Sequence, residues 1–82
     1  MSAAGTLPSV LVIEDEPQIR RLLRLTLESN GFRVHQAANG KEGLDRARTE
    51  RPEAVILDLG LPDADGVDIL KEIRRKSPVP VI

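Results

Sequence analysis

Short strand-like runs that alternate with helix-like segments are the feature that most constrains the fold of this chain. Residues 10–13 and 54–57 are continuous aliphatic runs, and residues 33–37 form a third, weaker run. Aliphatic runs of this length are typical of strands that are buried on both faces of a sheet. Strands that alternate with helices form right-handed crossovers in a parallel sheet covered by helices. The pattern therefore predicts an α/β fold.

The segment after the first run predicts an amphipathic helix. Pro17 suits its first turn, where the missing N–H of proline has no partner to lose, and Gly31 suits its end. The opposite, solvent-facing side of this helix is basic and carries Arg20, Arg21 and Arg24. The stripe expected to face the sheet is aliphatic and consists of Ile19, Leu22, Leu23 and Leu27.

A second helix is expected from Asn39 to the residue before Pro52. The side chain of Asn39 can cap it, with Glu42 three residues later, and Leu44 and Ala47 would form its inner face. Asn39 and Gly40 are also a strong hairpin-turn pair, but no alternating strand follows them, so the helix is favoured.

The third helix is expected to begin near Asp65. Basic residues lie toward its C-terminal end, where positive charge suits the helix dipole. Residues 79–82 then predict a fourth strand, in which this sequence stops. The side chains expected to point inward from the third helix are Val67, Ile69, Leu70 and Ile73.

Composition bounds both the organisation and the function of the chain. Its 82 residues, 40% of them hydrophobic, fit one domain at 9–82 after a flexible leader at 1–8. The absence of cysteine excludes disulfides, thiolate metal sites and cysteine nucleophiles. A net charge of -1 and a single aromatic residue argue against direct nucleic-acid binding. The apolar runs are too short to span a membrane and no secretory signal is present, so a cytoplasmic protein is expected.

Three acidic residues stand where strands are expected to end. Glu14 and Asp15 follow the first run, and Asp58 follows the third. The carboxyl ends of parallel strands share one edge of a sheet, so these carboxylates should converge if the first and third strands are neighbours. Like charges about 4 Å apart repel by about 4 kcal/mol at an effective dielectric constant of 20. A raised carboxyl pKa or a bound Mg²⁺ would relieve this repulsion, and we favour Mg²⁺, with Asp58 as a phosphoacceptor.

Acidic residues before helices have a simpler role as caps. Asp15 or Glu16 could cap the helix that begins at Pro17, and we expect Asp63 and Asp65 to act only in this way. Capping explains Asp58 less well, because this residue lies several positions before the next helix.

Two segments resemble the receiver domains of two-component response regulators: VLVIEDE at residues 10–16 and VILDLGLPDADG at residues 55–66. The resemblance extends from Val10 to the end of the chain. The segment at residues 57–66 looks most like winged-helix transcriptional regulators of the potassium-transport (Kdp) type. The resemblance implies a flavodoxin-like (CheY-like) doubly wound parallel sheet of order 2-1-3-4-5, truncated here in its fourth strand.

The same resemblance implies a function. A sensor histidine kinase would phosphorylate Asp58, Asp15 and Asp58 would bind Mg²⁺ directly, and Glu14 would act through water. The backbone carbonyl of Gly60 would be a further ligand. The domain would control an output domain, which in this family commonly binds DNA, and would not be a turnover enzyme. The basic face formed by Arg20, Arg21 and Arg24 would contact the kinase.

Departures from the family pattern qualify these expectations. The family's switch residues follow the fourth strand and are not present in this sequence, so we expect the fragment to self-associate or to be partly unfolded alone. A receiver-like interaction module that is never phosphorylated therefore stays as an alternative. His35 is expected to be an exposed strand residue rather than a ligand.

Two other classes fit the motifs less well. A haloacid-dehalogenase-like phosphohydrolase would carry a second Asp two residues after its nucleophile, where this chain has Gly60. A dinucleotide-binding domain would need a glycine-rich turn after the first strand, where this chain has EDEP.

Overall fold

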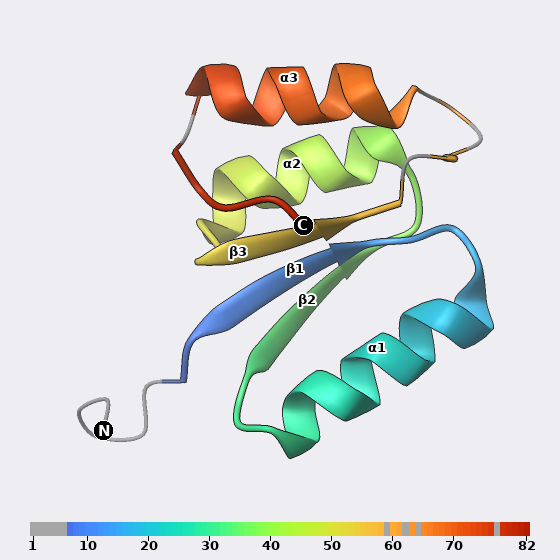
Figure 1. The fold of residues 1–82 in the computed structure, drawn as a ribbon, viewed down its shortest axis with the longest axis vertical. Coiled ribbons are helices and arrows are strands. Elements are labelled where there is room, and N and C mark those ends of the chain that lie inside the picture. Colours follow the sequence, from blue (N-terminus) through green and yellow to red (C-terminus); the bar gives the residue numbers. More distant parts are fainter. Residues whose placement is uncertain (1–6, 59, 62, 64, 77) are drawn as a thin grey trace.

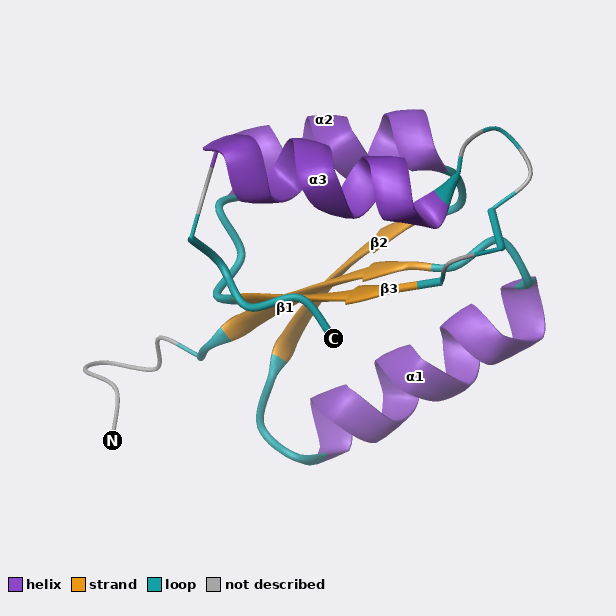
Figure 2. Cartoon of the chain, turned by 45° about the horizontal axis from the view of Figure 1, so that its top comes forward, coloured by secondary structure: helices purple, strands orange, loops and turns teal. Residues whose placement is uncertain are grey.

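The chain folds into a three-layer α/β unit with a parallel sheet in the middle. The computed structural model describes residues 7–82 except residues 59, 62, 64 and 77. Helix α1 covers one face of the sheet, and helices α2 and α3 lie side by side on the other face (Figures 1 and 2). The elements in chain order are β1 (Ser9–Ile13), α1 (Pro17–Ser29), β2 (Arg33–Ala37), α2 (Gly40–Glu50), β3 (Ala54–Leu57) and α3 (Gly66–Lys76).

The sheet has the order β2-β1-β3, and both pairings are parallel. Its central strand β1 pairs from Ser9 with β2 and from Val10 with β3. Val81 forms a single parallel bridge with Val55 on the outer side of β3. The predicted α/β architecture and parallel sheet are confirmed, and residues 79–82 contribute one bridge rather than a full strand.

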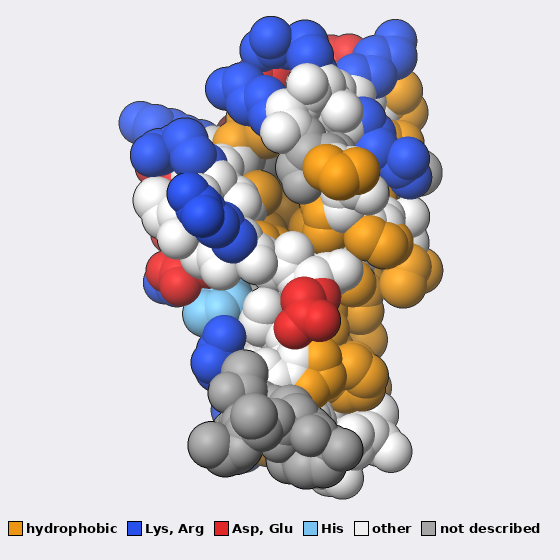
Figure 3. Space-filling view, turned by 90° about the vertical axis from the view of Figure 1, so that its left-hand side faces the viewer, with side chains coloured by type: hydrophobic (Ala, Val, Ile, Leu, Met, Phe, Trp, Pro, Cys, Tyr) orange, Lys and Arg blue, Asp and Glu red, His pale blue; other side chains and the backbone are white. Residues whose placement is uncertain are grey.

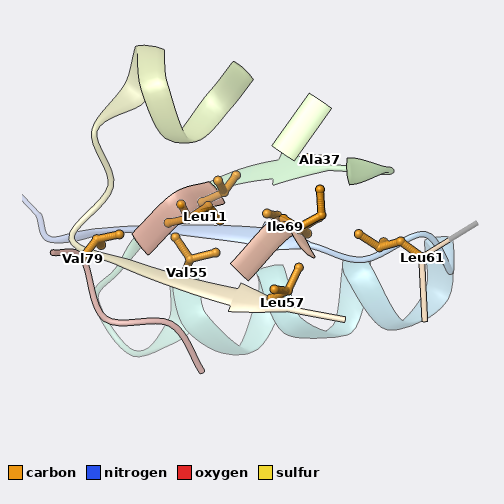
Figure 4. Close-up of a cluster of buried hydrophobic side chains, with 9 residues drawn as sticks. Leu11, Ala37, Val55, Leu57, Leu61, Ile69 and Val79 are labelled. Atoms are coloured by element: carbon orange, nitrogen blue, oxygen red, sulfur yellow. The ribbon is translucent and has the colours of Figure 1, made fainter. Parts of the chain in front are cut away.

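The main hydrophobic core lies between the sheet and helices α2 and α3 (Figure 4). All five residues of β1 are buried, as the apolar run predicts. In β3, however, only Val55 and Leu57 are buried, while Ala54 and Ile56 are half-buried. The prediction that this run is buried on both faces is therefore wrong. The reason is that α1 packs against β1 and β2, so the α1 side of β3 is less covered.

Helix α1 has its predicted ends but not its predicted burial. Pro17 is its first residue, Asn30 is its C-cap, and Gly31 follows in a left-handed conformation with φ 89°. No residue of this helix is fully buried, and Ile19 and Leu22 expose 48% and 63% of their surface. The expectation that these two side chains pack inward is wrong. Helix α1 is the one helix on its face among the described residues, so one side of its apolar stripe has no layer to pack against.

Helix α2 begins as its sequence predicts. The Asn39 side chain accepts a hydrogen bond of 2.9 Å from the N–H of Glu42, and the Glu42 carboxylate accepts one of 2.8 Å from the N–H of Ala38. Leu44 and Ala47 pack against the core. The helix, rather than the hairpin turn, is therefore confirmed at this position.

Helix α3 also begins at its predicted cap. The Asp65 carboxylate accepts a hydrogen bond of 2.8 Å from the N–H of Val67. Ile69 and Ile73 are buried and Leu70 is partly buried against the core. Val67 is 44% exposed, so the expectation that it points inward is wrong.

Asp63 caps a different helix from the one expected. Its carboxylate accepts hydrogen bonds from the N–H groups of Gly40, at 2.7 Å, and Lys41, at 3.2 Å, which belong to the first turn of α2. These N–H bonds, that of Gly40 first, lower the pKa of Asp63 below its ordinary value. The prediction that Asp63 serves α3 is wrong, because its carboxylate reaches the first turn of α2 instead.

The N-terminal leader expected at residues 1–8 falls largely outside the described residues. Of the part that is described, Leu7 is 40% exposed and the carbonyl of Pro8 accepts a hydrogen bond of 2.8 Å from Arg33. Among the helices of the described segments, none combines the length and the hydrophobicity that a membrane crossing requires.

Candidate metal and phosphoacceptor site

The three predicted carboxylates meet at one edge of the sheet. Glu14, Asp15 and Asp58 each offer a carboxylate oxygen, and these oxygens lie within 4.8 Å of one another. The three strands all point toward this edge (Figure 1). The sheet brings the residues together because its parallel pairing places the ends of β1 and β3 side by side.

Backbone hydrogen bonds hold the first residue beyond each strand in line with the sheet. The N–H of Glu14 donates to the carbonyl of Ala37 at 3.0 Å, and the N–H of Asp58 donates to the carbonyl of Ile13 at 2.9 Å. The backbone of the site is therefore an extension of the rigid sheet, although its side chains come from loops.

The environment of Glu14 disfavours its charged form. Partial burial raises its pKa above the ordinary value, and the negative charges of Asp58 and Asp15 raise it further. A hydrogen bond of 3.1 Å from the N–H of Glu16 to the Glu14 carboxylate acts in the opposite direction. Burial and the neighbouring negative charges therefore both disfavour the charged form of Glu14, and a cation bound beside it would stabilise that form.

Asp58 is half-buried and is oriented by its own loop. Its Oδ1 accepts a hydrogen bond of 2.9 Å from the N–H of Gly60. A Cβ at position 60 would lie 3.6 Å from Oδ1, an ordinary contact, so this position does not require glycine for steric reasons. The contact that the structure assigns to Gly60 is made by its N–H, and the ligand role of its carbonyl stays a prediction.

The capping alternative applies to Glu16 and not to Asp15. The Glu16 carboxylate accepts a hydrogen bond of 3.3 Å from the N–H of Gln18 and caps α1. The Asp15 side chain is exposed and lies with the other two carboxylates. The two acidic neighbours therefore have different roles, which their order in the sequence did not reveal.

The basic residues of α1 do not form one uniform solvent-exposed face. Arg21 is exposed, and Arg24 pairs with Glu28 at 3.1 Å. Arg20 instead turns back over the β1–α1 loop, where its Nη1 donates to the carbonyl of Glu14 at 2.8 Å. The expectation that Arg20 lies on a fully exposed face is therefore wrong, while the kinase contact expected of Arg20, Arg21 and Arg24 stays a prediction. The position of Arg20 in the first turn of α1 was the feature of the sequence that could have indicated this contact with the preceding loop.

His35 is not the exposed strand residue that its sequence neighbours predicted. Its side chain is only 17% exposed, and its Nδ1 lies 3.7 Å from a carboxylate oxygen of Glu50 at the end of α2. Its Nε2 is buried and has no hydrogen-bond partner among the described residues. Glu50 is distant in sequence, so only the packing of α2 beside β2 brings the two together.

A cavity of about 460 Å³ lies between the C-terminal ends of α2 and α3, away from the acidic cluster. Its apolar lining includes Leu44, Ile73 and Val79. Basic side chains gather over this end of the molecule (Figure 3), and Arg48, Arg51 and Lys76 line the cavity. None of the three acidic residues lines it, so the chemistry of the cluster does not depend on this cavity.

The acidic cluster has the donor set that a hard divalent cation requires. Its three side-chain donors are all oxygens, and carboxylates with open coordination positions suit Mg²⁺ better than metals that favour nitrogen or sulfur. Asp58 is also a carboxylate nucleophile that can form an acyl phosphate. The residues present therefore fit a magnesium site next to a phosphoacceptor.

Comparisons with known proteins place this arrangement in a family context. The family model described as the response regulator receiver domain matches residues 10–82. The chain is 50% identical over 74 residues to the KDP operon transcriptional regulatory protein KdpE of Escherichia coli, which covers 90% of this chain and 33% of that protein. It is 49% identical over 73 residues to the transcriptional regulatory protein KdpE of Mycobacterium tuberculosis. That match covers 89% of this chain and 32% of that protein. The chain thus spans about a third of the length of the curated relatives it matches.

Solved structures show the same fold. The chemotaxis protein CheY4 of Vibrio cholerae matches with a TM-score of 0.88 and 30% identity over 93% of this chain and 66% of that chain. The response regulator TrrA of Thermotoga maritima, solved in complex with Mg(2+)-BeF, matches with a TM-score of 0.84 and 37% identity over 87% of this chain and 62% of that chain. The predicted CheY-like fold and the likeness to Kdp-type regulators are confirmed.

Proposed function

The chain belongs to the response regulator receiver domain family, and from this premise we propose that Asp58 accepts a phosphoryl group from a sensor histidine kinase in a Mg²⁺-dependent reaction. The observation that carries the proposal is the convergence of the Glu14, Asp15 and Asp58 carboxylates within 4.8 Å. A single acidic residue after a strand offers a cation one ligand, whereas three converging carboxylates offer several oxygen ligands, and a cation would offset their mutual repulsion.

Asp58 performs the covalent step. One of its carboxylate oxygens attacks the phosphorus atom, a new O–P bond forms, and the bond between phosphorus and the donor nitrogen of a phosphohistidine breaks. The N–H of Gly60 holds Oδ1 of Asp58 and fixes the orientation of the carboxylate. The product is an acyl phosphate on Asp58, and the reaction happens once per phosphoryl group, so the domain is a phosphoacceptor and not a turnover enzyme.

The metal would be held by Glu14, Asp15 and Asp58, with the backbone carbonyl of Gly60 as a further ligand and Glu14 acting through water. When bound, Mg²⁺ supplies the positive charge that lets a carboxylate approach a phosphoryl group. The raised pKa of Glu14 is consistent with this assignment, because burial and then the negative charges of Asp58 and Asp15 both disfavour its charged form, which a bound cation would stabilise. The complex of the similar TrrA protein with Mg(2+)-BeF supports it as well.

The relatives extend the proposal beyond the chain. The two KdpE relatives are identical to this chain at about half of the matched residues. Both are transcriptional regulators, and the matched segment is about a third of their length. We propose that residues 9–82, after a leader at 1–8, form part of a receiver domain in a cytoplasmic regulator. Phosphorylation of this domain would control a DNA-binding output domain. Kinase contact would come from the α1 surface that carries Arg21 and Arg24, whereas the sequence alone had included Arg20 in that surface.

A receiver-like interaction module that is never phosphorylated is the second candidate. It is favoured by exposed apolar side chains: Ile19 and Leu22 on α1, and Ile82, which exposes 78% of its surface. Apolar surface of this kind favours pairing with another copy of the chain. Such a module would associate without Mg²⁺ or a phosphodonor, which separates it from the phosphoacceptor.

Mg²⁺ titration followed by acetyl phosphate tests the two candidates. Isothermal titration calorimetry should show Mg²⁺ binding to the chain, and intact mass spectrometry should then show one phosphoryl group per chain. Asp58→Asn should abolish phosphorylation, while circular dichroism shows that the variant keeps its helices. A chain that binds Mg²⁺ but is not phosphorylated, or an Asp58→Asn variant that is phosphorylated as fully as the parent, would contradict the assignment of Asp58.

A further inference from the structure

The guanidinium of Arg20 contacts the backbone of two residues of the acidic cluster. Its Nη1 donates to the carbonyl of Glu14 at 2.8 Å and, over a longer 3.4 Å, to the carbonyl of Asp15. These are the two residues that lead from β1 into α1. Arg20 lies in the first turn of α1, so its side chain ties the helix to the loop that precedes it.

The β1–α1 loop has backbone carbonyls that need hydrogen-bond donors, and few of its own N–H groups are available to donate to them. Residue 17 is a proline and has no N–H to donate. The N–H of Glu16 donates to the Glu14 carboxylate, and the N–H of Gln18 donates to the Glu16 carboxylate. With these donors committed to side chains, Arg20 supplies the loop carbonyls with a charged donor, which makes a stronger hydrogen bond than a neutral one.

We propose that Arg20 is a positioning residue of the metal site. By holding the carbonyls of Glu14 and Asp15, it fixes the backbone from which two of the three metal-binding carboxylates project. This inference rests on the proposed function of the acidic cluster as a Mg²⁺ site. It assigns Arg20 to the site itself and leaves Arg21 and Arg24 as the surface residues of α1.

A positioning role and a purely electrostatic role of Arg20 predict opposite changes in Mg²⁺ affinity when Arg20 is removed. If Arg20 acted only as a nearby positive charge, its loss would relieve repulsion of a second cation and strengthen Mg²⁺ binding. If it acts by holding the loop, its loss leaves the two carboxylates less ordered and weakens binding. Groups that orient metal ligands in this way typically contribute about 10-fold to 100-fold in metal affinity.

The experiment compares three variants of this chain by Mg²⁺ titration calorimetry. Arg20→Gln should weaken Mg²⁺ binding about tenfold. Arg20→Lys should weaken it by a smaller factor, because an ammonium keeps a charged donor for the loop carbonyls but lacks the planar guanidinium that places Nη1 near both of them. Arg21→Gln, which removes the same charge one residue away on an exposed position, should leave the affinity within about twofold.

A second readout examines the metal-free protein. Amide hydrogen exchange at Glu14, Asp15 and Glu16 should become faster in Arg20→Gln than in the parent chain, while exchange in β3 stays unchanged. Unchanged or tighter Mg²⁺ binding by Arg20→Gln, or unchanged exchange in the loop, would overturn the positioning role.

Acetyl phosphate separates positioning from kinase contact. This donor needs no kinase, so a residue that only contacts the kinase should not affect the reaction, whereas Arg20→Gln should slow it at limiting Mg²⁺. If the parent chain itself fails to bind Mg²⁺, the proposed function fails. If the parent binds and Arg20→Gln binds equally well, only the role of Arg20 fails.

Discussion

Gly43 of α2 lies so close to Ile13 of β1 that a Cβ on the glycine would stand 2.6 Å from Cδ1 of the isoleucine. Cγ1 and Cγ2 of Ile13 would also lie within 3.0 Å of that Cβ, so rotating one torsion does not relieve the contact. Ile13 is fully buried and directly precedes Glu14. The close packing of α2 against Ile13 therefore contributes to the core and also supports the backbone that leads into the acidic cluster.

We expect Gly43→Ala to destabilise the chain by about 1–3 kcal/mol, the usual range for inserting a methyl group into a packed core. Helix propensity alone predicts the opposite, a gain of about 1 kcal/mol. Urea unfolding measures the difference. The control is Lys41→Ala in the same helix, which is exposed and should have little effect. A more stable Gly43→Ala variant would show that Ile13 can move aside.

Glu14→Gln should stabilise the metal-free chain and weaken Mg²⁺ binding. The substitution removes one of three mutually repelling charges but keeps an oxygen that can accept the N–H of Glu16. A gain of about 1 kcal/mol in unfolding free energy is typical when such a site is relieved. Thermal unfolding with and without Mg²⁺ measures both effects. A variant that is less stable without metal would contradict the conclusion that burial and neighbouring charge disfavour the Glu14 carboxylate.

The same group predicts a pH dependence. The pKa of Glu14 is higher in the folded chain than the ordinary value of 4.5, so the folded state holds this proton more tightly than the unfolded state. The contribution of Glu14 to stability is therefore favourable at low pH and is lost as pH rises from 4.5 through the raised value. Mg²⁺ affinity should change in the opposite direction and fall as Glu14 takes up its proton. Titrations across this interval should show the fall in the parent chain and a smaller one in Glu14→Gln.

Asp63→Ala should lower the melting temperature by a few degrees, because it removes the acceptor for two N–H groups at the start of α2. The depressed pKa of Asp63 means that this stabilisation is present above the ordinary value of 3.8 and is lost as pH falls through the lower, folded value. Asp63→Asn should cost less, since its amide oxygen still accepts one bond. Hydrogen exchange at Gly40 and Lys41 checks the location. Faster exchange in α3 instead would indicate that Asp63 serves that helix.

Charge reversal at Arg24 tests the proposed kinase surface. Arg24→Glu should slow phosphotransfer from the histidine kinase in the intact regulator, because Arg24 lies on the outer side of α1 with only an exposed partner, Glu28. The reaction with acetyl phosphate should not change. Since the reversal also creates repulsion with Glu28, the double variant Arg24→Glu, Glu28→Arg restores the pair with opposite polarity. Equal kinase rates for all three proteins would remove the proposal.

Self-association should depend on the apolar side of α1 and on Ile82. Leu22 is 63% exposed, so a polar side chain at this position removes little buried apolar surface. Leu22→Gln combined with Ile82→Gln should therefore shift the chain toward monomer in light scattering without lowering its helix content. A parent chain that is already monomeric and melts cooperatively would count against association.

Local signals in the sequence determined the elements of this protein. Helix caps such as Asn39 with Glu42 and the aliphatic run of β1 involve residues that are neighbours in the chain, so their interactions are encoded within a few positions. The parallel arrangement followed from the alternation of elements, whereas the convergence of Glu14 and Asp58 also needed β1 and β3 to be neighbours, as the structure shows them to be. The family resemblance added the roles of these residues, which no local pattern contains.

Only the tertiary structure decided which distant groups meet and which faces stay open. Asp63 accepts a hydrogen bond from Gly40, 23 residues earlier, at the start of α2. His35 lies near Glu50 only because α2 packs beside β2. The exposure of Ile19 depends on which layers cover α1, and the contact of Arg20 depends on the path of the loop. Such contacts form when separate helices and strands pack together. How well they pack depends on the complementary shapes of both surfaces, which the sequence of one segment does not specify.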